Sequence, residues 1–220
     1  MLGERSSGTN FISRLLGRNT PLRPSDALGW KHGAAPLAIP PDLVVVCVVR
    51  NAASWALSMH ARPWHATPAL QRLALPDFLR AEWDSTVDRA KYFNGAGELV
   101  GQPLLADRDA SGRRHANLFR LRTAKLQALA RFGGSGASAV LLRLEEAQVA
   151  PERVVDGLRA GLGLPPRETS LRPVVRRLGT RFKPAIPDRP ETPKALAAAD
   201  LAFLRAETDA ALEAELGYTY

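Results

Sequence analysis

The chain is poor in cysteine and has no long hydrophobic segment. Cys47 is its only cysteine, which excludes an internal disulfide framework, and its place within an apolar run predicts a buried, inert thiol. No run of about 18 consecutive apolar residues occurs, so no transmembrane segment is expected. The first residues are polar and do not form the hydrophobic region of a secretory signal. We therefore expect a cytoplasmic protein.

Aromatic residues are also few, at 6% of the chain. The formal net charge of +8 and the isoelectric point near 10.3 indicate an anionic partner. The arginines are spread along the chain, and neither a zinc-ligand spacing nor an RNA-binding aromatic motif is present. We therefore expect no nucleic acid and no metal, and a small, highly charged ligand accounts for the charge equally well.

Apolar segments alternate with helical patterns along the 220 residues, which predicts an α/β fold. The continuous apolar segments 43–49 and 139–144 are typical of parallel strands buried on both faces. A shorter strand is predicted over 28–33. Helices are predicted over 52–59, 75–87, 117–132, 151–162 and 193–216.

We expect a single domain over 1–220 with a three-layer, mostly parallel sheet flanked by helices. The segments 92–116 and 164–190 show no periodicity and are predicted to be irregular surface segments. On the predicted helix 117–132, Arg122 and Lys125 share one face at i, i+3, for which we expect a solvated surface.

The segment 3–10, Gly-Glu-Arg-Ser-Ser-Gly-Thr-Asn, joins a small-residue loop to an amphipathic helical pattern. Such a loop directs backbone N–H groups and the positive end of the helix dipole at one point, which suits an oxyanion. Its spacing resembles the Gly-x4-Gly of a phosphate-binding loop, but Thr9 stands where the P-loop lysine is expected. The only basic side chain in the loop is that of Arg5. This pattern favours an oxyanion other than a magnesium-bound triphosphate.

Only Met1 and Leu2 precede this loop, whereas a phosphate-binding loop normally follows a full strand. The first strand is either very short or begins upstream of Met1, and we expect the second case. A chain extended by its upstream coding sequence should then have a higher thermal midpoint of unfolding, and an unchanged midpoint would contradict this expectation.

Arg50 follows the apolar segment 43–49, at a strand end of the kind where ligands collect in open parallel sheets. Ser54 and Ser58 lie at i, i+4 on the next predicted helix and share a face. An arginine binds a phosphate through a fork of N–H groups, and the Ser58 hydroxyl adds a donor. The alternative is that Arg50 merely ends the strand.

Taken together, these segments resemble the sulfotransferase family. Residues 3–10 resemble its 5′-phosphosulfate loop, and residues 49–58, with an arginine and then a serine eight residues later, resemble its 3′-phosphate motif. The resemblance implies a P-loop-like architecture that binds 3′-phosphoadenosine 5′-phosphosulfate (PAPS) as co-substrate, without a metal. It assigns contacts with PAPS to Arg5, Ser6, Ser7, Gly8, Thr9, Asn10, Arg50 and Ser58.

The family often carries a lysine–histidine pair near the acceptor, and Lys31-His32 occupies the corresponding position here. The resemblance therefore implies catalysis by His32 as general base, together with Arg5 and Lys31. Residues 142–146 resemble a later strand that leads into an acidic dipeptide, with Leu144 where an aromatic residue is common. Residues 177–181 are the candidate for the family's late basic-glycine segment.

The resemblance implies transfer of a sulfuryl group to a hydroxyl or amine of a small-molecule or glycan acceptor, and the sequence leaves the acceptor and the oligomeric state open. His60 and His65 are further candidates near the acceptor, whereas His115 is expected in solvent. A loop of Arg62, Trp64 and His65 is either an acceptor wall or a surface loop with one packed tryptophan.

The alternative functions are a P-loop-type small-molecule kinase and a non-catalytic nucleotide- or nucleic-acid-binding protein.

Overall fold

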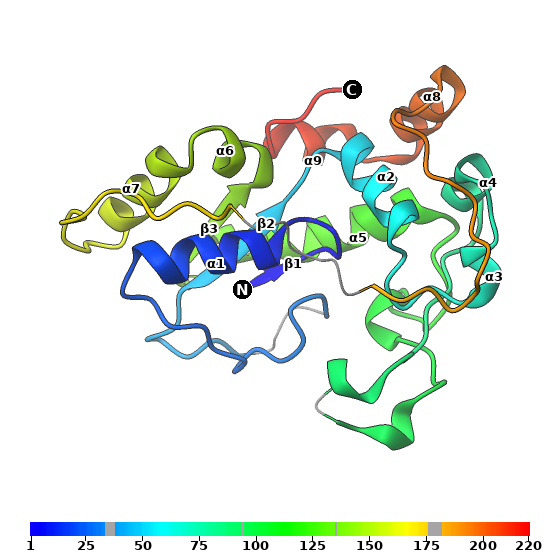
Figure 1. The fold of residues 1–220 in the computed structure, drawn as a ribbon, viewed down its shortest axis with the longest axis horizontal. Helices are drawn as coiled ribbons and strands as arrows, with labels where there is room; N and C mark the ends of the chain where they lie inside the picture. The colour runs from blue at the N-terminus through cyan, green and yellow to red at the C-terminus, as the bar shows by residue number, and fades with distance from the viewer. Residues whose placement is uncertain (34–37, 94, 135, 176–181) are drawn as a thin grey trace. The chain divides into compact units, whose positions relative to one another are not determined.

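A computed structural model describes residues 1–33, 38–93, 95–134, 136–175 and 182–220, and the chain divides into two compact units (Figure 1). The first unit comprises Met1–Arg50 and Leu129–Arg181, and the second comprises Asn51–Ala128 and Phe182–Tyr220. Each unit is therefore built from two separate stretches of sequence. The single domain over 1–220 stays a prediction.

A parallel sheet forms the centre of the first unit. Its strands are β1 (Leu2–Gly3), β2 (Val45–Val49) and β3 (Ala139–Arg143), in the order β1-β2-β3. Cys47 lies opposite Leu2 on one side and opposite Leu141 on the other. All residues of β2 are buried, as its continuous apolar sequence predicts. The burial predicted for 139–144 is wrong over β3, whose residues are half-buried or exposed, with Leu141 38% exposed. The α/β class and the parallel pairing are confirmed.

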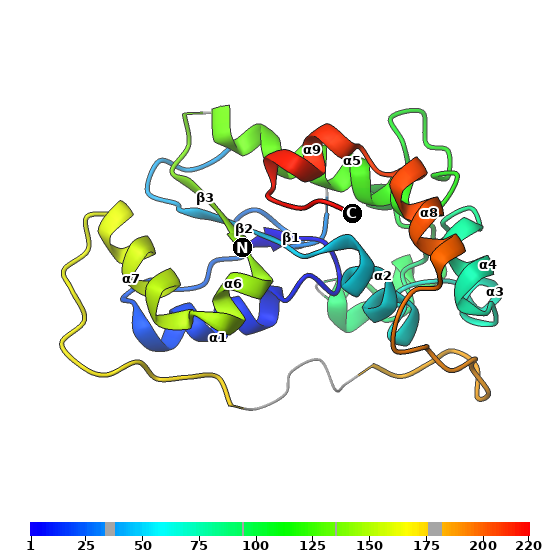
Figure 2. The same ribbon diagram turned by 90° about the horizontal axis from the view of Figure 1, so that it is seen from above.

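The helices of the first unit are α1 (Thr9–Asn19), α6 (Leu144–Val149) and α7 (Pro151–Gly161), with a 3-10 helix over Arg131–Gly134. Helices α1 and α7 lie side by side (Figure 2). Their apolar faces join the sheet in one core cluster. The buried members of this cluster are Ile12, Leu15, Leu16, Val46, Val48, Ala147, Val155 and Leu158. The amphipathic helix predicted after the loop is thus confirmed, and its apolar face holds the loop against the sheet.

The short strand predicted over 28–33 is wrong. Two tight turns occupy this segment, closed by hydrogen bonds from the Gly29 amide to the Asp26 carbonyl and from the Gly33 amide to the Trp30 carbonyl. Gly29 has a positive φ of 74°, which breaks an extended backbone. One strand-like contact remains, because the Gly3 amide donates to the Lys31 carbonyl at 3.0 Å.

The second unit is mainly helical. Its helices are α2 (Ala52–Ala61), α3 (Pro68–Gln71), α4 (Leu75–Arg80), α5 (Leu118–Ala130, of which the last two residues belong to the first unit), α8 (Ala198–Glu207) and α9 (Ala210–Glu215). Short 3-10 helices over Ala90–Tyr92, Gly97–Leu99 and Leu105–Asp107 lie within or beside the segment predicted to be irregular. In the described parts of 164–190, no helix or strand is found.

Some predicted helices are too long. The helix predicted over 75–87 ends at Arg80, because the next residue, Ala81, is extended. The helix predicted over 193–216 starts only at Ala198 and is broken at Thr208. There Asp209 begins α9 by accepting a hydrogen bond from the Leu212 amide with its side chain.

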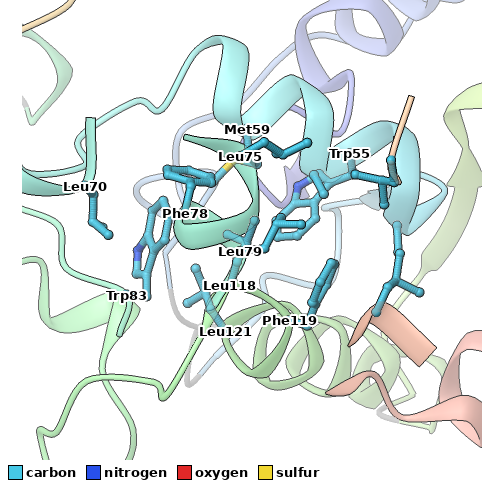
Figure 3. Close-up of a cluster of buried hydrophobic side chains, with 14 of the residues drawn as sticks. Trp55, Met59, Leu70, Leu75, Phe78, Leu79, Trp83, Leu118, Phe119 and Leu121 are labelled. Carbon is cyan, nitrogen blue, oxygen red and sulfur yellow. The ribbon is translucent and has the colours of Figure 1, made fainter. Parts of the chain in front are cut away.

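The core of the second unit is built around large aromatic side chains. Trp55, Phe78, Trp83 and Phe119 are almost fully buried and are surrounded by leucines from α3, α4 and α5 (Figure 3). Phe78 and Trp83 meet edge to face, with ring centroids 5.8 Å apart. This core fixes α2, the helix that follows Arg50.

The face of α5 that carries Arg122 is not solvated, and this prediction is wrong. Arg122 is fully buried (0% exposed), and its guanidinium donates to both carboxylate oxygens of Glu213, at 2.6 and 3.0 Å. It also lies 5.2 Å from the Trp55 ring centroid. Lys125 is largely buried too and pairs with Asp107 at 3.1 Å. Partners remote in sequence make the burial of these charges possible.

Candidate functional site

The loop between β1 and α1 is a sharp, internally bonded turn. Ser6 and Gly8 have positive φ angles of 62° and 93°. The Ser7 hydroxyl and amide both donate to the Glu4 carbonyl, at 2.7 and 3.2 Å. The chain then enters α1 at Thr9. This backbone matches the loop-to-helix junction predicted from the glycine spacing.

Carbonyl oxygens along the loop accept hydrogen bonds from the protein itself. His32 Nδ1 bonds the Gly3 carbonyl at 2.6 Å, and Arg50 Nη1 donates to the Ser6 carbonyl at 3.0 Å. The Gly8 carbonyl accepts from amides in the first turn of α1. Because Gly8 is the N-cap, no side chain of the cap residue competes for the helix N-terminus. The positive end of this helix therefore suits an anion.

Both glycines of the loop are required by close packing. A Cβ added at Gly8 would lie 2.4 Å from Leu144 Cδ1, and one at Gly3 would lie 2.7 Å from the Val48 carbonyl oxygen. Leu144, at the start of α6, is itself buried. Leu144 thus packs directly against the loop. In the sulfotransferase family, which the sequence resembles, an aromatic residue is common at this position.

Replacing Gly8 by alanine should therefore destabilise the protein. A side chain at φ 93° costs about 1–3 kcal/mol, and the contact with Leu144 adds an overpacking cost of about the same size. We expect the free energy of unfolding in urea to fall by about 2–4 kcal/mol. The matched control is Gly17→Ala within α1, where an added Cβ meets nothing within 4 Å. It should stabilise by about 0.5–1 kcal/mol, and equal effects of the two variants would contradict the packing argument.

Positive side chains gather at this loop. Arg5 is only 5% exposed, and its guanidinium carbon lies 5.9 Å from the Trp30 ring centroid. Lys31 Nζ donates to Asn10 Oδ1 at 2.5 Å, and Arg50 reaches the loop through Ser6. Burial lowers the pKa of Lys31, against an opposing effect of the Asp26 carboxylate. The structure thus brings Arg5, Lys31 and Arg50 to one loop.

His32 is held in one orientation beside the same loop. A carbonyl oxygen can only accept, so His32 Nδ1 is the protonated nitrogen in its bond to Gly3. In the neutral imidazole the lone pair is then on Nε2, the atom a general base would use. The imidazole and the Trp30 ring also meet in a T-shaped arrangement, with centroids 5.5 Å apart. Trp30 was not predicted as a site residue, although it directly precedes the Lys31-His32 pair in the sequence.

Ser58, the remaining predicted PAPS contact, is a half-buried residue of α2 and belongs to the second unit. Ser54 uses its hydroxyl to donate to the Asn51 carbonyl at the start of that helix. The candidate basic-glycine segment 177–181 lies outside the described residues. The structure therefore brings together the predicted residues of the first unit, which are 5–10, 31, 32 and 50.

The other histidines belong to the second unit and have partners there. His60 is buried, with Nδ1 2.7 Å from Thr192 Oγ1 and Nε2 3.1 Å from the Leu73 carbonyl, and burial lowers its pKa. His65 is buried and pairs with Asp88 at 2.7 Å. Trp64, on the loop proposed as an acceptor wall, packs against the Tyr92 and Phe182 rings.

His115 is half-buried, not solvated as predicted, and burial lowers its pKa. No group of three or more histidine, cysteine or acidic residues suited to a metal ion occurs in the described part of the chain. Within the same residues, no helix is both long enough and apolar enough to cross a membrane.

Comparison of the chain with known proteins gave no match to a protein-family model, to a curated protein or to a solved structure.

Proposed function

We propose that this protein is a cytoplasmic, P-loop-like sulfotransferase that moves a sulfuryl group from PAPS to a hydroxyl or amine of a small-molecule or glycan acceptor. One observation carries the proposal: Arg5, Lys31, Arg50 and the N-terminus of α1 converge on a glycine loop. Thr9 stands where a triphosphate-binding loop has its lysine. A sulfuryl group carries less charge than a terminal phosphoryl group, so this loop suits a phosphosulfate better.

In the proposed reaction the acceptor oxygen or nitrogen bonds to sulfur while the bond from sulfur to the bridging phosphate oxygen breaks. Adenosine 3′,5′-bisphosphate leaves. Arg5, Lys31 and the first amides of α1 stabilise the charge that develops on the bridging oxygen. His32 Nε2 takes the acceptor proton, and the bond from Nδ1 to the Gly3 carbonyl fixes the imidazole orientation that this step needs.

Arg50 has a double task in this proposal. One N–H group holds the loop through the Ser6 carbonyl. The planar fork of a guanidinium also matches the oxygens of a phosphate, so Arg50 would bind the 3′-phosphate, with the Ser58 hydroxyl as a further proposed contact. Loss of Arg50 would then remove both a phosphate ligand and the hydrogen bond that shapes the loop.

Arg50→Ala should abolish retention of the protein on immobilised adenosine 3′,5′-bisphosphate. Arg153→Ala is the charge-matched control, because Arg153 is exposed on α7, and it should be retained like the unmodified protein. Retention of Arg50→Ala at the level of this control would contradict the assignment of the site.

A thermal-shift comparison separates the proposed function from its alternatives. Adenosine 3′,5′-bisphosphate at about 100 times its dissociation constant should stabilise the protein by about 2.7 kcal/mol, and ATP with magnesium should have little effect. Stabilisation by ATP with magnesium instead would favour the small-molecule kinase. DNA binding with a steep salt dependence, and no effect of the bisphosphate, would favour the non-catalytic binder.

A further inference from the structure

Lys31 is tied to the loop at both its backbone and its side chain. Its carbonyl accepts from the Gly3 amide at 3.0 Å, and its Nζ donates to Asn10 Oδ1 at 2.5 Å. Asn10 is the second residue of α1 and precedes Lys31 by 21 residues in the sequence. The ammonium is therefore fixed at the first turn of the helix.

A cation is not stabilised by the helix at this position, because the N-terminus is the positive end of the dipole. The Asn10 amide oxygen offers a hydrogen bond but no negative charge. Among the described residues, the Asp26 carboxylate favours the charged form of Lys31, and the Lys31 ammonium and the Met1 amino group repel each other. Burial favours the neutral amine. Asn10 thus fixes the position of the ammonium without neutralising it.

We infer that Asn10 is a positioning residue, which holds the Lys31 ammonium over the start of α1 and leaves its positive charge for an anion bound in the loop. The inference rests on the proposed function only for the identity of that anion. Asn10 then acts on the phosphosulfate through Lys31, and an aspartate at the same position would bind Lys31 equally well but cancel its charge.

The test is competitive labelling of lysine amines with acetic anhydride over a range of pH, with the Lys31 peptide quantified by mass spectrometry. In the unmodified protein, Lys31 should react with a midpoint below the ordinary value of a lysine amine, because burial disfavours its charged form. Asn10→Asp should raise the Lys31 midpoint by about one pH unit or more, because it places a carboxylate against the amine. An acidic residue in the first helical turn is favourable, so this variant should fold.

The control for added charge is Gln148→Glu, an exposed position on α6, which should leave the Lys31 midpoint unchanged. Asn10→Asp should also weaken binding of adenosine 3′,5′-bisphosphate by about 10-fold, and Gln148→Glu should not. If the Lys31 midpoint is the same in Asn10→Asp and in the unmodified protein, the inference is overturned. If the midpoint shifts but the unmodified protein does not bind the bisphosphate, the proposed function fails and the positioning of Lys31 by Asn10 stands.

Discussion

His32→Asn is expected to lower the turnover of sulfuryl transfer by about 100- to 10,000-fold, the usual contribution of a general base. The asparagine amide can still donate to the Gly3 carbonyl, so the hydrogen bond that anchors residues 31–32 to the loop is preserved. What the substitution removes is the basic lone pair of Nε2. Affinity for adenosine 3′,5′-bisphosphate should therefore change by no more than about twofold.

The measurement is the steady-state turnover of His32→Asn with PAPS and an excess of acceptor, together with titration of the bisphosphate. His115→Asn is the control, because His115 is a half-buried histidine with no assigned part in the reaction, and it should keep its turnover within about twofold. Equal turnover of His32→Asn and the unmodified protein would exclude His32 as the base. A parallel loss of bisphosphate affinity would instead indicate that His32 only holds the loop.

Arg122→Met is expected to destabilise the second unit by about 3–5 kcal/mol, as is typical when one partner of a buried ion pair is removed. Arg122 and Glu213 are 0% and 2% exposed, so the remaining carboxylate has no access to bulk water. Glu213 also accepts from the Tyr220 hydroxyl at 2.9 Å, and that hydroxyl accepts from the Ala52 amide. The loss would therefore reach the start of α2.

Urea denaturation followed by the fluorescence of the buried tryptophans Trp55 and Trp83 measures this loss. Arg120→Met is the matched control, since Arg120 lies on the same helix in an exposed ion pair with Glu207, and it should cost no more than about 1 kcal/mol. Adding Glu213→Gln to Arg122→Met should recover much of the stability, because glutamine is neutral and still accepts from Tyr220. If Arg122→Met lowers the free energy of unfolding as little as Arg120→Met does, the buried pair of Arg122 and Glu213 does not stabilise the second unit as proposed.

The parts of the fold that were predicted from the sequence depend on neighbours in the chain. The continuous apolar run of β2 predicts a buried parallel strand, and β2 is buried throughout. The similar run of β3 forms a parallel strand as predicted but is only partly covered, because β3 lies at the end of the strand order. The spacing of Gly3 and Gly8 before an amphipathic pattern predicts the turn into α1, and Gly8 adopts the positive φ of 93° that this turn uses. Arg5 and Asn10 were predicted as site residues for the same reason, as members of that loop.

Other features were decided by contacts between residues far apart in the sequence. The i, i+3 spacing of Arg122 and Lys125 shows that they share a face of α5, but not whether that face is buried. Glu213, 91 positions from Arg122, supplies the charge that allows the burial. Likewise, the turns over 28–33 bring His32 Nδ1 to the Gly3 carbonyl and Lys31 Nζ to Asn10. Composition and spacing by themselves determined the loop, its helix and the strands β2 and β3, whereas only the tertiary structure decided which charges are buried, because desolvating a charge requires a partner that local sequence does not specify.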